Sequence, residues 1–394
     1  MALIKINTRS IPDDAVTPAK VSQNLGRRNI LINGAMQVAQ RGTSFTQTTG
    51  QLYTTDRFIA TVGSSFNMDT TITQDNTVPT GEGFTNSLKV TPNSVVSPSG
   101  SDNGGIAQRL EIQDVDHLGW GTSSAKNITV SFWVRSSKTG VYCVQLQQNV
   151  SGSSTEVYSH VKEYTITAAN TWQKVILTFA GNTAQAMVTG DKFGDGLRVN
   201  WWLACGTSDH NAADSWLQSG SYLATSNQVN FMDSTNNTWY MTGCQLEVGD
   251  TATPFEHRKF GEELQLCKRY YQYYPYSAEG TALGQANGTT MTVNRYHWAA
   301  QILPVAMRAT PSITFESGSG TNLDNKARYL TTPSGQGGND ITPYGHNEYW
   351  EGWDGVSGSR NPGGFTTIVM KAYNEFNGFT CYGFQAGFAV NSEL

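Results

Sequence analysis

The chain has 394 residues, of which 38% are hydrophobic and 14% are charged, and its formal net charge is −5. This length exceeds that of one typical domain, and the hydrophobic fraction is too high for a disordered chain. The sequence contains no stripe of Lys and Arg residues that would predict a nucleic-acid-binding surface. It also contains no run of about 18 apolar residues that would predict membrane insertion. The abundance of Gly, with 40 residues, and of aromatic residues favours many short strands joined by turns.

Residues 1–28 are polar, contain Pro12 and Pro18, and hold too few apolar side chains to form a core. They have two interpretations: a disordered tail, or an anchor that becomes ordered on a larger assembly. The first ten residues lack the apolar segment of a secretory signal peptide. We therefore expect the protein to be made in a cytosol.

Residues 29–256 are predicted to form one long β domain, with a turn at Asn33-Gly34 near its start. The segment 128–134 alternates, which places Ile128, Val130, Phe132 and Val134 on one face of a strand. The same strand-like pattern recurs at 87–91, 141–150, 174–179, 200–205 and 238–248. Alternation with a period of two, interrupted by Gly, Asn and Ser, predicts a β-sandwich or jelly roll.

The segment 259–269 is the exception, because Glu262 and Glu263 precede Lys268 and Arg269 in the order that a helix dipole favours. It predicts a short helix within a linker at 257–269. Residues 270–394 then form a second, smaller β-sandwich. Its predicted strands are 270–276, 289–298, 312–315, 366–372 and 379–390.

Residues 332–364 form a predicted loop rich in Gly, Asn, Ser and aromatic residues, and its length is typical of a functional or a disordered loop. Aromatic rings stack on sugar rings, while planar amides and carboxylates hydrogen-bond to hydroxyl groups. The alternative is that these rings form a small core of their own. The candidate glycan-binding residues are Tyr344, His346, Glu348, Tyr349, Trp350, Trp353 and Asp354.

Motifs for catalysis or cofactor binding are missing from the sequence. There is no HExxH, P-loop or GxSxG motif, and the lone Gly194-Asp195-Gly196 predicts a turn. Glu348, Glu351 and Asp354 are the only acids that suggest a glycosidase pair, and solvated turn residues are the commoner explanation. We therefore expect a protein that is not an enzyme and needs no cofactor.

Metal binding has equally little support in the sequence. Calcium ligation by Asp340, Glu348, Glu351 or Asp354 lacks a recognised loop motif. The cysteines are odd in number, widely spaced and never in CxxC, so buried free thiols are expected. We expect no metal site.

Several segments together resemble the tail-fibre and receptor-binding proteins of tailed phages and prophages. They are 29–42, 53–58, 131–136, 171–175, 239–258, 261–271, 303–311 and 392–394. The specificity of the resemblance lies in their combination and order. Within them, 245–247 is interpreted as a core strand, and Asp56-Arg57 as a buried or domain-edge pair.

The resemblance implies a carbohydrate-binding-module-like jelly roll at 29–256 and a receptor-binding β-sandwich at 270–394. It also implies a homotrimer on the virion, made in the host cytoplasm, in which residues 1–28 bind tail or other virion proteins. The function it implies is that of an adhesin for a host surface glycan, and it implies no catalytic residue. Two alternatives remain: a head fibre or capsid decoration protein, and a glycan depolymerase, for which the repeats of a parallel β-helix are missing.

Overall fold

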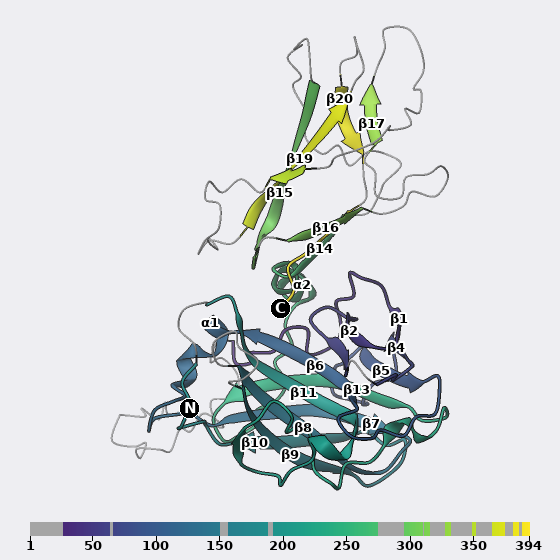
Figure 1. Ribbon diagram of the computed structural model, residues 1–394, viewed down its shortest axis with the longest axis vertical. Helices are drawn as coiled ribbons and strands as arrows, with labels where there is room; N and C mark the ends of the chain where they lie inside the picture. Colours follow the sequence, from purple (N-terminus) through teal and green to yellow (C-terminus); the bar gives the residue numbers. More distant parts are fainter. Residues whose placement is uncertain are drawn as a thin grey trace, which may run out of the picture. The chain divides into compact units, whose positions relative to one another are not determined.

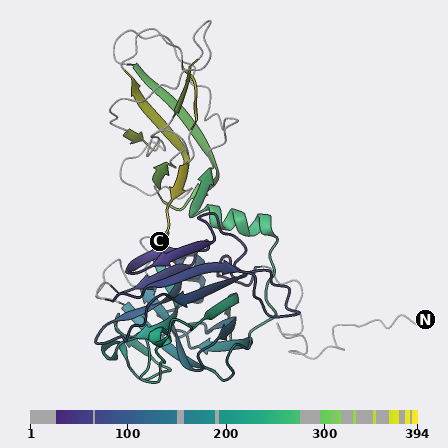
Figure 2. The same cartoon turned by 90° about the vertical axis from the view of Figure 1, so that its right-hand side faces the viewer.

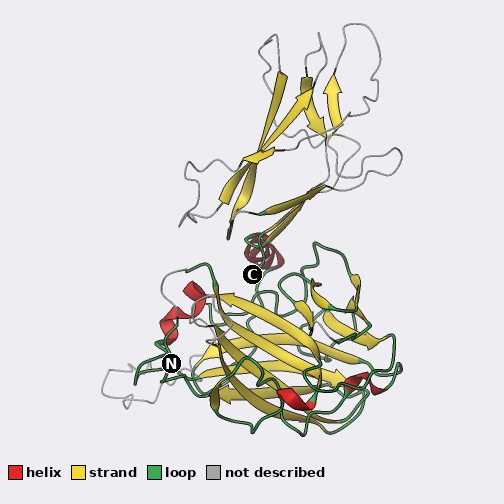
Figure 3. Ribbon diagram, in the orientation of Figure 1, coloured by secondary structure: helices red, strands yellow, loops and turns green. Residues whose placement is uncertain are grey.

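The computed structural model describes residues 27–63, 66–149, 157–187, 192–274, 295–309, 311–315, 328–331, 349–351, 365–374, 381–385 and 388–394. The chain divides into two compact units, one running to Phe260 with Leu394 added, and the other running from Gly261 to Glu393. Strands dominate both units, and the helices are short (Figure 3). The all-β fold class predicted from the sequence is confirmed, whereas the homotrimer stays a prediction.

The first unit is a sandwich of two antiparallel sheets (Figure 1). The six-stranded sheet has the order β1 (Ser44–Gln47), β4 (Thr70–Asp75), β5 (Ser87–Pro92), β13 (Trp239–Val248), β7 (Ile128–Ser136), β10 (Gln173–Phe179). The seven-stranded sheet has the order β12 (Trp216–Gln218), β9 (Val157–Ile166), β8 (Gly140–Asn149), β11 (Asp195–Cys205), β6 (Asn103–Glu111), β3 (Ile59–Val62), β2 (Gly50–Tyr53). Several neighbouring strands, such as β5 and β13 or β11 and β6, come from distant parts of the sequence, as a jelly roll requires.

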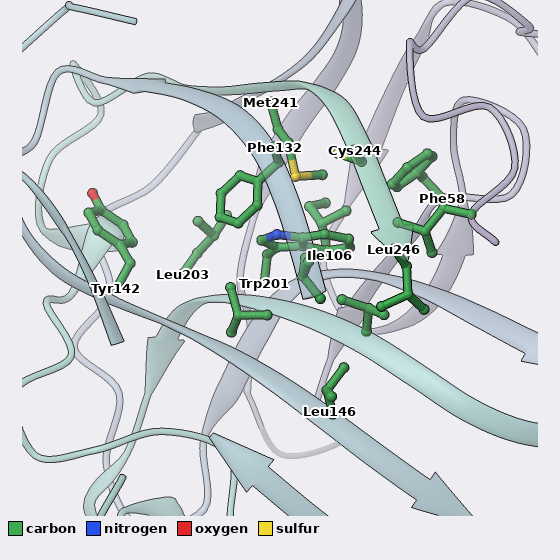
Figure 4. Packing of buried hydrophobic residues seen from close by; sticks show 14 of the residues in the cluster. Phe58, Ile106, Phe132, Tyr142, Leu146, Trp201, Leu203, Met241, Cys244 and Leu246 are labelled. Carbon is green, nitrogen blue, oxygen red and sulfur yellow. The ribbon is translucent and has the colours of Figure 1, made fainter. Parts of the chain in front are cut away.

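The core lies between these two sheets. The alternating residues Ile128, Val130, Phe132 and Val134 of β7 are fully buried, as the sequence predicts. From the opposite sheet, the indole of Trp201 packs edge-on against Phe132 with ring centroids 5.9 Å apart. Figure 4 shows Trp201 and Phe132 among aliphatic side chains of this cluster. Burial of these large side chains is the main stabilising contribution to the unit.

Strand β6 was not predicted, because Gly104 and Gly105 interrupt its apolar pattern. A Cβ atom at Gly105 would lie 2.3 Å from the Trp201 carbonyl oxygen, so close packing of the backbones requires glycine there. The segment from Ile30 to Ile32 is irregular and belongs to no strand, although it does open the β domain. A four-residue helix, α1 (Ile112–Val115), follows β6.

Helix α2 (Phe260–Lys268) starts at the last residue of the first unit and otherwise belongs to the second. It is the helix predicted at 259–269 and is drawn as a coiled ribbon in Figure 2. The described strands of the second unit form small antiparallel sheets. These strands are β14 (Tyr271–Tyr274), β15 (Arg295–Met307), β16 (Ser312–Phe315), β17 (Arg328–Thr331), β18 (Tyr349–Glu351), β19 (Phe365–Asn374), β20 (Cys381–Gln385) and β21 (Phe388–Asn391). Strands β14 and β16 pair with the two sides of β21.

Candidate functional site

The predicted glycan site at 344–354 falls mostly outside the described residues. Tyr349 and Trp350 belong to β18, where they lie opposite Lys371 and Met370 of β19. The predicted loop 332–364 is therefore interrupted by a paired strand. Tyr344, His346, Glu348, Trp353 and Asp354 lie outside the described residues, as does Asp340. The predicted glycan-binding and calcium-binding roles stay predictions.

Several segments that carry the family resemblance form a buried polar clasp, which we define by Asn29, Glu256 and Arg258. The Glu256 carboxylate accepts hydrogen bonds from the backbone N–H groups of Arg28 and Asn29, at 2.9 and 2.7 Å. The Asn29 side chain donates to the Cys244 carbonyl and accepts from the Leu246 N–H, both at 3.0 Å. The clasp thus ties the start of the β domain to its last strand, which is a structural role.

Arg258, the third residue of the clasp, and the neighbouring Gly34 also contact the chain around Asn29 and Cys244. The Arg258 guanidinium donates to the carbonyl oxygens of Asn29 and Leu31. A Cβ atom at Gly34 would lie 2.0 Å from the Cys244 carbonyl oxygen, so no larger residue fits there. The residues of the clasp and Gly34 therefore have a structural role.

Asp56 and Arg57 are both buried, with 1% of each exposed. Of the two positions expected from the sequence, buried or at a domain edge, they occupy the buried one. The Asp56 carboxylate lies 3.6 Å from the Arg41 guanidinium and accepts the Gln40 N–H at 3.0 Å. The Arg57 guanidinium donates to the Arg109 carbonyl. Asp56 therefore holds the loop before β3 against residues 40–41, and Arg57 holds the same loop against β6.

A group of aromatic residues lies on the outer side of the six-stranded sheet, which we call the ring face: Phe84, Trp133, Trp172, Tyr240, Phe255 and His257. The register places Trp133 opposite Thr242, and Tyr240 opposite Arg135, on the face turned away from the core. The Trp172 and Tyr240 ring centroids are 6.2 Å apart. Trp133 and Trp172 are half-buried, which leaves part of each ring available for contact with a ligand.

Gly243 forms the centre of the ring face. This residue has a φ of 62° and lies where the pairing of β13 with β7 shifts register. A Cβ atom here would lie 2.5 Å from the Phe84 ring and 3.1 Å from the Trp133 ring, so both rings lie directly over the glycine. Phe84 in turn contacts Phe255 and His257, with centroid distances of 5.0 and 5.1 Å. His257 is exposed.

Cationic side chains surround these rings. The Arg135 guanidinium lies 5.0 Å from the centroid of the Tyr240 ring, and the Lys89 ammonium lies 5.5 Å from it. Lys174 of β10 is exposed and pairs with Trp133 across the strands. Ile176, the next residue of β10 on the same face, is 53% exposed. The ring face thus combines flat apolar surfaces with hydrogen-bond donors and positive charge.

The outer side of the seven-stranded sheet differs, because the chain's own segment 206–230 covers it. Trp202, Tyr222 and Leu223 form a second buried cluster there with Cys143 and Val161. The Gln145 amide donates to Ser159 and to the Tyr222 carbonyl, at 2.9 and 2.8 Å. It accepts from Asn200 and from the Trp202 indole, at 3.0 and 3.1 Å. Every polar group of Gln145 is therefore satisfied internally.

No group of three or more His, Cys, Asp or Glu side chains that could hold a metal ion occurs among the described residues. Cys143, Cys205, Cys244 and Cys267 are buried free thiols, as expected. Burial raises the pKa of Cys143 to about 11, which keeps this thiol protonated and unreactive at neutral pH. Within the described residues no helix is long and apolar enough to span a membrane.

The ring face was missed in the sequence, although part of the signal was present. Alternation in 128–134 puts Trp133 on the face opposite to the core residues, and Arg135 follows on that same face. The contributions of Trp172, Tyr240 and Phe84 depend on strand order and register, which the sequence does not reveal.

Comparison with known proteins gives matches to solved structures alone. No protein-family model matches the chain, and no curated protein matches it. The enzymatically active domain of tailspike protein 4 from bacteriophage CBA120 is 11% identical, with a TM-score of 0.29 over 56% of this chain and 21% of that one. The chain thus matches about a fifth of the length of that domain.

Two carbohydrate-binding modules are also similar to this chain. The xylan-binding CBM22-2 domain of Paenibacillus barcinonensis Xyn10C is 14% identical, with a TM-score of 0.26 over 55% of this chain and 96% of that one. The family 11 module of a Clostridium thermocellum cellulosomal cellulase is 9% identical, with a TM-score of 0.25 over 55% of this chain and 98% of that one.

Proposed function

We propose that this protein is the receptor-binding subunit of a tailed-phage tail fibre, which attaches the virion to a glycan on the host surface. In this proposal it binds without catalysis, residues 1–28 dock on tail proteins, and the fibre is a homotrimer. The order of the sequence motifs supports the phage assignment.

The observation that carries glycan binding is the ring face. Its tryptophan rings, Trp133 and Trp172, are half-buried on an outer sheet surface that segment 206–230 does not cover. Sugars present apolar C–H faces to such rings and hydroxyl groups to neighbouring polar side chains. The backbone of a β-sheet holds the rings in fixed positions, so little conformational entropy is lost on binding.

Individual contacts of this kind are weak, and the homotrimer supplies the affinity. Sites with a Kd of about 1 mM gain on the order of 100-fold or more when linked sites engage one surface together. A fibre with several copies of the ring face would therefore adhere firmly to a repetitive polysaccharide.

The test is binding of the fluorescently labelled full-length protein to host cells, with purified host polysaccharide as competitor. We expect saturable binding that the polysaccharide abolishes and that Trp133→Ala reduces. Ile176→Ala is the matched control, because it removes an exposed side chain from the same face without removing a ring. Absence of saturable cell binding would contradict the proposal and favour a structural virion protein, and cell binding that host polysaccharide fails to compete would contradict a glycan receptor.

A further inference from the structure

We infer that the ligand of the ring face is an acidic polysaccharide whose sugar rings carry carboxylate groups. This inference rests on the proposed function, since it names the class of glycan that the same surface takes. It is carried by Lys89, Arg135 and Lys174, which lie beside the rings on strands β5, β7 and β10 of one sheet, with β13 between β5 and β7.

Arg135 is oriented to meet an anion. Its Nε atom donates to the Asn170 carbonyl at 2.8 Å, and its guanidinium lies against the Tyr240 ring. These contacts fix the plane of the guanidinium and leave its terminal N–H groups for an added partner. A planar guanidinium binds a carboxylate with two parallel hydrogen bonds, which a neutral hydroxyl cannot match.

Within the described residues, neither Lys174 nor Arg135 forms an ion pair with a carboxylate. The ion pairs of lysine side chains there involve Lys89, Lys138 and Lys162. Lys89 is 3.7 Å from Asp75, so its charge is partly balanced. Burial opposes ionisation of Asp75, yet hydrogen bonds from Thr77 and the Lys89 charge lower its pKa overall. Glu247, on the same face, is buried and accepts from Gln245 and Thr253.

On this face of the sheet the cations Lys89, Arg135 and Lys174 outnumber the carboxylates Asp75 and Glu247, although the formal net charge of the chain is −5 and Glu82 is an exposed acid near Phe84. A local charge opposite in sign to the whole molecule attracts anions to that surface in particular. The cations also lie next to the aromatic rings, since Lys174 is paired with Trp133 and Arg135 with Tyr240 on neighbouring strands.

Two other occupants fit parts of this surface less well. A single-stranded nucleic acid also brings rings and negative charge, but proteins bind it along a stripe of many Lys and Arg side chains, whereas the rings here have Lys89, Arg135 and Lys174 beside them. A second copy of the chain, packed by two-fold symmetry on the same face, would bring Arg135 and Lys174 against their own equivalents.

The experiment measures affinity of the full chain for a panel of carboxylated polysaccharides: polygalacturonate, hyaluronate, alginate and polysialate. Each is compared with its carboxyl-reduced form, which keeps the sugar backbone and removes the charge. We expect at least one acidic member to bind about tenfold more tightly than its reduced form, with affinity that falls as salt rises from about 0.05 to about 0.5 M.

The variants locate the effect. Arg135→Gln should weaken binding of the acidic member about tenfold and Lys174→Gln about threefold, while binding of the reduced form stays unchanged. Arg135→Lys should recover part of the loss. Lys192→Gln, an exposed lysine before β11, is the charge-matched control and should change nothing.

The outcomes separate this inference from the proposed function. Equal binding of acidic and reduced forms would overturn the inference and leave glycan binding intact. Failure of both forms, with no binding to host cells, would overturn both. Tighter binding of an oligothymidylate than of any polysaccharide, or self-association that Trp133→Ala abolishes in light scattering, would also overturn the inference.

Discussion

The two outer faces of the sandwich use similar side chains for opposite purposes. Each carries tryptophan and tyrosine beside polar groups, yet Trp202 and Tyr222 are 4% and 1% exposed on the seven-stranded sheet. On the six-stranded sheet, Trp133 and Trp172 are half-buried, with no covering segment of the first unit above them among the described residues. Aromatic residues therefore mark a binding surface only where the chain itself does not cover them.

The largest expected effect is that of Trp202→Ala on the covered face. Removing this buried indole leaves a cavity and takes away one of the two donors to the Gln145 oxygen, so we expect the free energy of unfolding to fall by about 3–5 kcal/mol. Urea denaturation followed by circular dichroism measures it. A loss below about 1 kcal/mol would show that segment 206–230 contributes no core.

Gln145→Leu tests the same face through its hydrogen bonds. The leucine would leave the Asn200 amide and the Trp202 indole N–H without their acceptor, at a cost of about 2–3 kcal/mol. Limited proteolysis should then cut within 206–230 faster than in the wild type. Gln147→Leu, two residues along the same strand, is the control, and equal proteolysis of both variants would contradict this account.

On the ring face, Trp133→Ala is expected to affect glycan binding more than stability. Loss of one stacking ring should weaken glycan binding about tenfold, while a half-buried side chain contributes less to the fold than Trp202. Isothermal titration and urea denaturation of the same preparation give both numbers. A large loss of stability with unchanged affinity would mean that the ring face is only a small outer core.

The smallest expected effect is a pH dependence of stability through His160 of β9. Burial lowers the pKa of His160, and the nearby Lys162 charge adds to this against the opposing Asp214 hydrogen bond. Because the unfolded chain takes up this proton more readily, the free energy of unfolding should fall as the pH drops below the ordinary histidine pKa of about 6.5. His160→Gln should flatten that slope relative to wild type, and an unchanged slope would contradict the assignment.

Much of the fold was predictable because alternation records which residues face the core. The segments that became β5, β7, β8, β10, β11 and β13 were all predicted, and so was α2. Strand β6 was missed because its glycines serve close backbone packing instead of side-chain burial. The ring face was missed because its residues come from segments around 84, 133, 172 and 240, which only strand register brings together.

The predicted site at 344–354 shows the opposite case. Its aromatic residues are adjacent in the sequence, so the composition was visible without any knowledge of register. Of its members, Tyr349 and Trp350 belong to strand β18, and the glycan-binding role of the group stays a prediction. The ring face and this predicted site are therefore rival locations for the same ligand.

Side-chain footprinting by hydroxyl radicals, with and without bound host polysaccharide, compares these two locations in one measurement. Our account predicts that the reactivity of Trp133 and Trp172 falls on binding, while that of Trp202 stays low throughout. Unchanged reactivity of Trp133 and Trp172, together with protection of Trp350 and Trp353, would contradict it.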